Sequence, residues 1–205
     1  GVLSAISLAE YMPRKLGEVV KPMIELLAAI PSIIYGFLGM VFIAPAITKL
    51  FGISLGRTAL TGSIVLSMMI TPTIVSISSE VISSVPREYR MAAIALGAPK
   101  WRVVKDVVLP AAAPGLATSV ILGVGRVAGE TAAILFTSSV YLMRGLPSTV
   151  LEPVMTLTYH LFVLLVATPG GVTGKPFAMA LLLLGLVVSL NVLAYIIRVY
   201  YRRRW

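Results

Sequence analysis

Long stretches of the sequence contain no charged residue, and their lengths predict helices that cross a membrane. The apolar core of a bilayer is about 30 Å thick, and a helix needs about 20 predominantly apolar residues to cross it. Charge-free stretches near this length cover residues 26–48, 58–79, 107–125, 153–174 and 176–197. The pattern therefore predicts an all-α integral membrane protein.

Basic residues collect in three places, which sets the expected orientation because lysine and arginine are retained on the cytoplasmic side. The clusters are Arg14, Lys15 and Lys21; Arg87, Arg90, Lys100, Arg102 and Lys105; and Arg198, Arg202, Arg203 and Arg204. If all three are cytoplasmic, an even number of crossings separates neighbouring clusters. We expect crossings at 26–48, 58–79, 111–141 and 176–197, with the C-terminus in the cytoplasm.

Two segments remain outside these four crossings. Segment 153–174 contains His160 and ends in Thr168-Pro169-Gly170-Gly171, so we expect an interfacial or re-entrant helix on the outer side. Residues 1–10 are too short to cross alone and are expected to end an earlier crossing. The sequence therefore predicts one transmembrane domain over residues 1–205. We expect this domain to be the later part of a longer membrane protein.

Composition excludes other classes of protein. Of the 205 residues, 58% are hydrophobic and only 12% are charged, which does not fit a water-soluble domain. The formal net charge of +9 does not indicate nucleic-acid binding, because the cations punctuate apolar stretches instead of forming one water-facing patch. Cysteine is absent, which excludes disulfides and thiol chemistry in this sequence.

The segment between the second and third crossings contains start and stop signals for two short helices. Ser84 lies two residues before Pro86, and Glu88 lies in the first turn. Gly97 follows the last apolar residue, and Pro99 opens the second helix. One face of the first helix is apolar and is flanked by Arg87 and Arg90; it consists of Tyr89, Ala92, Ala93 and Leu96. Such a loop either rests on anionic lipid or docks on another protein.

The spacing in this loop resembles the EAA loop of ABC importer permeases. Ala92-Ala93 is followed after three residues by Gly97 and, nine residues later, by Val107-Val108-Leu109-Pro110. In that family the loop is the coupling helix, which lies in a groove of the cytoplasmic ATPase. The resemblance implies that loop 86–110 contacts the ATPase through the residues Glu88, Tyr89, Ala92, Ala93, Leu96, Gly97, Leu109 and Pro110. Met91 stands where the family's leading glutamate is usual, and Glu88 is the candidate substitute.

Two further motifs make the resemblance more specific. Together with the loop, residues 30–36 (IPSIIYG) and 125–131 (GRVAGET) resemble the membrane subunits of the phosphate-specific ABC importer. The helix around Asn191, with its arginine-rich end, resembles the A-type of the two permease subunits. The resemblance implies a permease of the prokaryotic plasma membrane that imports inorganic phosphate by alternating access. Its partners would be a homologous permease, an ATPase dimer and an extracytoplasmic phosphate-binding protein.

Arg126 and Glu130 are the charged residues in the interior of a predicted crossing. An arginine at bilayer depth costs about 3 kcal/mol on insertion scales, so each such charge needs a reason. On a continuous helix, residues four apart share a face. The two side chains either neutralise each other in a salt bridge or belong, with Thr131, to a phosphate pathway.

The pathway interpretation fits the chemistry of phosphate. The arginine fork matches two phosphate oxygens, and a glutamate can accept a hydrogen bond from the protonated oxygen that sulfate lacks. Gly125 and Gly129 have the spacing that lets a second helix pack closely. We expect Arg126, Glu130 and Thr131 to contact the substrate.

No catalytic or metal site is predicted. Residues 170–176 resemble a nucleotide-binding P-loop, but Pro169 replaces its first glycine and Pro176 its magnesium-binding hydroxyl residue. His160 has no evident partners for metal binding or base catalysis. The sequence therefore predicts a transport subunit without a cofactor, with ATP and magnesium bound by the partner ATPase.

Three alternatives remain open. The first is an ABC permease for another oxyanion, sulfate or molybdate. The second is an energy-independent channel or carrier whose middle loop binds only lipid. The third is a membrane sensor that relays phosphate supply.

Overall fold

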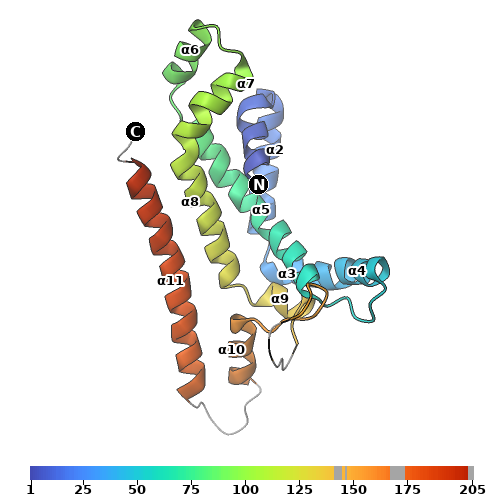
Figure 1. The fold of residues 1–205 in the computed structure, drawn as a ribbon. Helices are drawn as coiled ribbons and strands as arrows, with labels where there is room; N and C mark the ends of the chain where they lie inside the picture. The colour runs from blue at the N-terminus through green and yellow to red at the C-terminus, as the bar shows by residue number, and fades with distance from the viewer. Residues whose placement is uncertain (141–144, 146, 167–173, 203–205) are drawn as a thin grey trace. The chain divides into compact units, whose positions relative to one another are not determined.

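The structure is a computed structural model that describes residues 1–140, 145, 147–166 and 174–202 (Figure 1). It divides into two units. The first unit comprises Gly1–Ala28, Thr71–Gly125 and Leu190–Trp205, and the second comprises Ala29–Ile70 and Arg126–Ser189. Each of the three longest helices contains residues of both units. They are α5 (Ala59–Ser83), α8 (Leu109–Ala128) and α11 (Gly174–Arg202).

Short helices complete the first unit. They are α1 (Val2–Ile6), the π-helix η1 (Ser7–Tyr11), α2 (Arg14–Ala29), α6 (Arg87–Ala95), α7 (Lys100–Arg102) and the π-helix η3 (Val103–Val108). The buried core of this unit consists of Ala5, Val75, Ile82, Val85, Val103, Val108 and Ala112. It therefore joins α1, α5, η3 and the start of α8.

In the first unit, α5 and α8 run side by side (Figure 1). A Cβ at Gly115 of α8 would lie 2.4 Å from Cγ1 of Val81 on α5, so the glycine is what allows this approach. The buried hydroxyls of Ser78 and Ser119 are 2.8 Å apart and form a hydrogen bond between the two helices. Small residues and hydroxyl pairs of this kind are typical of helix packing in membranes.

Helix α2 makes one ion pair with α5 and leaves much of its apolar surface exposed. Lys21 lies 3.7 Å from Glu80 of α5. On the other side of α2, Leu16, Val19 and Leu26 are more than half exposed. An exposed apolar surface of this kind is expected where lipid or another subunit covers it.

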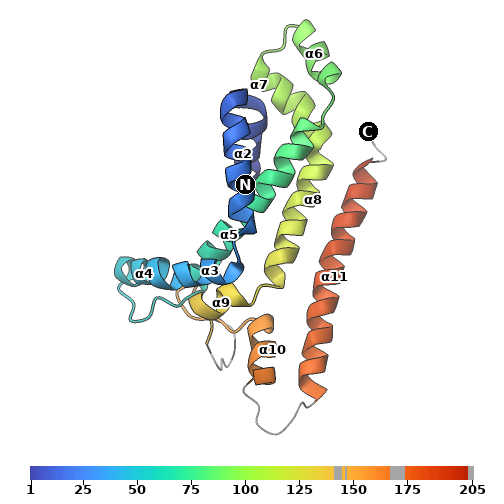
Figure 2. The same ribbon diagram turned by 180° about the vertical axis from the view of Figure 1, so that it is seen from behind.

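The second unit contains α3 (Ser32–Leu38), the π-helix η2 (Gly39–Ile43), α4 (Ala44–Phe51), α9 (Ala132–Thr137) and α10 (Leu157–Val166). Helices α3 and α9 lie against each other (Figure 2). A Cβ at Gly36 would be only 2.8 Å from the Cα of Ala133. The close packing of these two helices therefore requires a residue without a side chain at position 36.

Replacing Gly36 by alanine is expected to lower the stability of the protein, whereas Gly185→Ala raises it. The added methyl group at position 36 meets backbone, and overpacking of this kind costs about 1–3 kcal/mol. A Cβ at Gly185 of α11 meets nothing within 4 Å among the described residues. There alanine gains about 0.5–1 kcal/mol of helix propensity. Thermal unfolding in detergent measures both; equal shifts in the two variants would contradict the packing argument.

A loop of the second unit covers the start of α5. The backbone amides of Ala59 and Leu60 donate hydrogen bonds of 2.8 Å to the carbonyls of Glu152 and Val150. The hydroxyl and amide of Ser148 donate to the Glu152 carboxylate and hold its pKa below the usual range. The loop thereby satisfies amides that have no partner within their own helix.

Among the described residues, four helices are long and apolar enough to cross a membrane, which agrees with the predicted fold class and the predicted number of crossings. They are Ser32–Phe51, Ala59–Ser83, Lys100–Ala128 and Gly174–Ile197. Within segment 153–174, the described helix is α10, whose ten residues span about 15 Å and are too few to cross alone. Parts of the predictions lie outside the described residues. These are the end of the predicted third crossing at residue 141, together with Thr168, Pro169, Gly170, Gly171, Arg203 and Arg204.

Two predicted boundaries are wrong. The first crossing begins at Ser32 and not at residue 26, because Pro31 adopts an extended backbone (φ −56°, ψ 135°) that ends the preceding helix. The third begins at Lys100, since the second loop helix continues into α8 without a break, and it ends at Ala128 instead of continuing to residue 141.

Candidate functional site

The loop between α5 and α8 folds as its sequence predicts. Helix α6 follows Pro86, whose backbone is extended, and α7 follows Pro99. Gly97 lies between them with φ +81°, a left-handed conformation that other L-residues rarely adopt. Three local signals, two prolines and one glycine, therefore place the two helices.

The predicted apolar face of α6 lines a hollow in the first unit. The hollow has a volume of about 880 Å³, and four predicted residues contribute to it: Tyr89, Ala92, Ala93 and Leu96. Its remaining walls come from the end of α5 and the start of α8, including Val81, Ala111 and Gly115. Leu96 is 90% exposed, so its side chain is available to another molecule.

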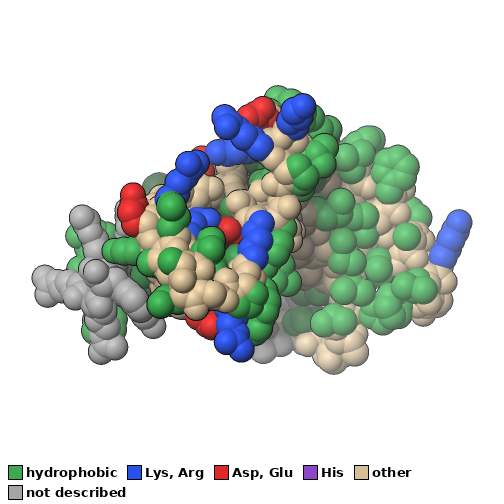
Figure 3. All heavy atoms as spheres, turned by 90° about the horizontal axis from the view of Figure 1, so that it is seen from above, with side chains coloured by type: hydrophobic (Ala, Val, Ile, Leu, Met, Phe, Trp, Pro, Cys, Tyr) green, Lys and Arg blue, Asp and Glu red, His purple; other side chains and the backbone are tan. Residues whose placement is uncertain are grey.

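Exposed basic side chains are frequent in the loop 86–110, and the view from above shows basic side chains next to hydrophobic ones (Figure 3). Arg87, Lys100, Arg102 and Lys105 are all exposed. Glu88 is exposed as well but does not line the hollow. Leu109 and Pro110 are half-buried at the start of α8.

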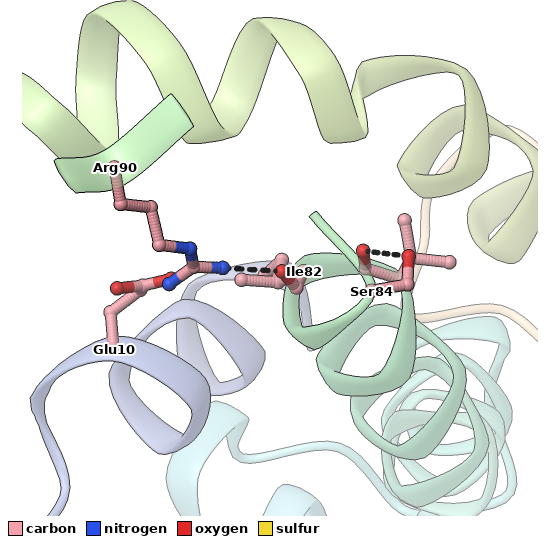
Figure 4. A network of polar contacts seen from close by, with 5 residues as sticks. Glu10, Ile82, Ser84 and Arg90 are labelled. Carbon is pink, nitrogen blue, oxygen red and sulfur yellow. Dashed lines mark hydrogen bonds and ion pairs between the residues drawn. The ribbon is translucent and has the colours of Figure 1, made fainter. Parts of the chain in front are cut away.

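Arg90 differs from the other basic residues of the loop, because its side chain points into the first unit. It forms an ion pair with Glu10 of η1 and donates a hydrogen bond of 2.7 Å to the carbonyl of Ile82 in α5 (Figure 4). From the sequence alone, Arg90 is expected only to flank the apolar face of the first loop helix. Glu10 was the available signal, since it is the one charged residue among the first thirteen.

The prediction that Arg126 and Glu130 share one face of a continuous helix is wrong. Helix α8 ends at Ala128, and residues 129–131 connect it to α9. The amide of Ala133 donates to Glu130 Oε1 at 3.4 Å, and the hydroxyl of Thr158 donates to the Glu130 carbonyl at 2.9 Å. The carboxylate therefore lies beside the first turn of α9.

The other predicted residues of this region lie at the end of α8 and in the connection to α9. Thr131 is the residue that precedes α9, and Arg126 is exposed in the isolated chain. Among the described residues, a Cβ at Gly125 meets nothing within 4 Å, and one at Gly129 meets only the Arg126 carbonyl at 3.8 Å. Close helix packing at these glycines stays a prediction that needs a second subunit.

Residues 1–205 match the family described as binding-protein-dependent transport system inner membrane component. The chain is similar to the probable ABC transporter permease protein YqgH of Bacillus subtilis, at 42% identity over 65% of this chain and 43% of that protein. It is similar to the phosphate transport system permease protein PstC 2 of Mycobacterium tuberculosis, at 41% identity over 64% and 46%. It is also similar to PstC of Xylella fastidiosa, at 36% identity over 94% and 63%.

These similarities agree with the predicted resemblance to phosphate permeases. Both of these phosphate-transport relatives carry the PstC name. They therefore do not support the prediction that the chain resembles the A-type of the two permease subunits. The chain spans about half the length of the curated relatives it matches.

Proposed function

The chain belongs to the family of binding-protein-dependent transport system inner membrane components, and on this premise we propose that it imports inorganic phosphate as the permease subunit of an ATP-driven transporter. The observation that carries the proposal is the similarity to phosphate transport permeases over as much as 94% of the chain. The multi-pass structure, with four helices long enough to cross a membrane, supports it.

The partner that supplies energy is a cytoplasmic ATPase that binds ATP and magnesium, and it contacts the loop 86–110. An exposed apolar patch with exposed cations in the same loop is suited to a protein groove with acidic edges. This assignment places the loop and the C-terminus on the cytoplasmic side, in agreement with the distribution of basic residues. A homologous permease and an extracytoplasmic phosphate-binding protein complete the transporter.

The substrate contacts are Arg126, Glu130 and Thr131. Arg126 offers a planar fork of donors to two phosphate oxygens. Glu130 lies in the non-helical connection four residues later, where its carboxylate can accept a hydrogen bond donated by the protonated oxygen of hydrogen phosphate. Irregular backbone at membrane depth is tolerated where it lines a cavity, and the break after α8 fits such a position.

Uptake of radiolabelled phosphate into proteoliposomes tests the proposal. The vesicles contain the full-length protein with its partner permease, ATPase and binding protein, and sulfate is added as a competitor. We expect uptake that requires ATP and is not reduced by excess sulfate. Uptake of another anion in place of phosphate would contradict the substrate, and flux without ATP would indicate a channel or carrier.

Replacing Glu130 by glutamine is expected to weaken discrimination between phosphate and sulfate. The neutral amide can donate as well as accept, so it removes the acceptor-only group that selects a protonated oxygen. In Glu130→Gln we expect tenfold excess sulfate to inhibit phosphate uptake, a change of about tenfold in relative affinity, or about 1.4 kcal/mol. Glu18→Gln, on the exposed face of α2, is the matched control. Unchanged sulfate resistance in Glu130→Gln would remove Glu130 from the selectivity mechanism.

A further inference from the structure

We propose that Arg90 is a positioning residue that joins α6 mechanically to η1 and α5, so that displacement of α6 by the ATPase moves these helices with it. The inference rests on the proposed function, because it assumes that an ATPase acts on α6. It concerns how movement reaches the membrane helices, and not which surface the ATPase touches.

The guanidinium of Arg90 connects three elements of the first unit. Its Nη1 donates to Oε1 of Glu10 in η1, and its Nη2 donates at 2.7 Å to the carbonyl of Ile82 in the last turn of α5 (Figure 4). Glu10 is 80 residues from Arg90 in the sequence. One planar group therefore fixes the positions of α6, η1 and the end of α5 relative to one another.

Burial makes this connection stiff. The Arg90 side chain is 21% exposed and that of Glu10 is 8% exposed, so water competes little for their charges. Electrostatic attraction is stronger in such an environment, and removal of either partner leaves an uncompensated buried charge. The pair is thus suited to transmit force, unlike the exposed pair Arg14–Glu18, whose side chains are 93% and 64% exposed.

Helix α6 also lies against η3, but its side chains make few polar contacts. In this helix, every residue of which is described, only Arg90 and Ala93 are not exposed. They are three residues apart and so occupy the same inward face. Ala93 packs against the apolar core, while Arg90 is the one α6 side chain that makes a hydrogen bond or ion pair. Packing of α6 against η3 and the apolar core is not directional, so the directional restraint comes from Arg90.

The π-helix η1 receives a second contact from the same loop. The Lys100 ammonium lies over the ring of Tyr11, 5.1 Å from its centroid. Glu10 and Tyr11 are adjacent in η1, so both helices of the loop contact one short segment. This convergence indicates η1 as the element that moves with the loop. Its connections are to α1, whose Ala5 is fully buried in the core of the unit, and to α2.

The ratio of phosphate imported to ATP hydrolysed tests the proposal in the complete transporter. In Arg90→Gln and Glu10→Gln we expect ATP hydrolysis within twofold of the wild type and at least a fivefold fall in uptake per ATP. Arg14→Gln, which removes an arginine of α2 whose side chain is 93% exposed, is the control and should keep the wild-type ratio. A charge-reversed double variant, Glu10→Arg with Arg90→Glu, should recover part of the coupling. An unchanged ratio in Arg90→Gln, or an equal loss of hydrolysis and uptake, would overturn the proposal.

A second measurement does not depend on the transported solute. Spin labels on Ser7→Cys in η1 and Leu96→Cys after α6 report the distance between these two positions, and residues 1–205 contribute no other cysteine. In the wild-type transporter we expect one distance distribution with and without trapped ATP. In Arg90→Gln the distribution should shift or broaden when ATP is trapped; an unchanged distribution would overturn the proposal. If the wild type moves no phosphate but this distance behaviour holds, only the proposed substrate fails.

Discussion

Replacing Arg126 by glutamine is expected to reduce ATP-driven phosphate uptake about 10- to 100-fold without preventing assembly of the transporter. A hydrogen bond to a charged group contributes about 1.5–3 kcal/mol, and each 1.4 kcal/mol changes a rate or affinity about tenfold. Arg126 is exposed in the isolated chain, so its replacement leaves no vacant space in a packed core. The initial rate of uptake in proteoliposomes measures the loss.

Three variants separate a substrate contact from a structural role. Arg126→Lys keeps the charge but loses the planar fork, so we expect an intermediate rate. Arg14→Gln, which removes an arginine whose side chain is 93% exposed on α2, should transport as the wild type does. Full activity of Arg126→Gln would show that this arginine has no part in the pathway, and loss of assembly would show that it is structural.

The sequence predicted best where the signals are local. Pro86, Gly97 and Pro99 each act on the backbone of their own neighbourhood, by fixed φ angles or by access to positive φ, and the two loop helices lie where these residues place them. Charge-free length similarly identified four membrane-spanning helices, because hydrophobic thickness constrains each of them separately.

The break between α8 and α9 was not predicted, because glycine is tolerated in membrane helices and so gives a weak stop signal. Gly129 and Glu130 were therefore assigned to one long helix that included Arg126. The structure instead satisfies the connection with contacts from Ala133 and from Thr158, which is 28 residues away. Tertiary contacts of this kind have no pattern in a single sequence.

The ion pair of Glu10 with Arg90 shows the same limit. The sequence shows a lone carboxylate at the edge of an apolar run and several arginines that could pair with it. Choosing among them requires knowledge that η1 lies beside α6, which depends on how α1 and α5 pack in the core. The residues of a site can thus be named from sequence more readily than their partners.

Replacing Leu96 by aspartate is expected to abolish stable binding of the ATPase and, with it, nucleotide-dependent uptake. Leu96 is 90% exposed and lines the hollow beside α6, so the change should leave the fold of this chain intact. In the assembled transporter the new carboxylate becomes buried at the docking surface without a partner. Such a charge costs about 3–5 kcal/mol, which weakens binding by at least about 100-fold.

Co-purification of the ATPase in detergent measures this loss, and a matched substitution isolates its cause. Val150→Asp makes the same kind of change at a residue that is 63% exposed and belongs to the second unit, whereas the loop belongs to the first. It should keep both ATPase binding and uptake, because a carboxylate that stays in water costs little. If Leu96→Asp retains the ATPase, the exposed apolar surface of α6 rests on lipid and the energy-coupling contact lies elsewhere. If both variants lose it, the effect is one of overall stability, and the docking surface needs another explanation than the apolar face of α6.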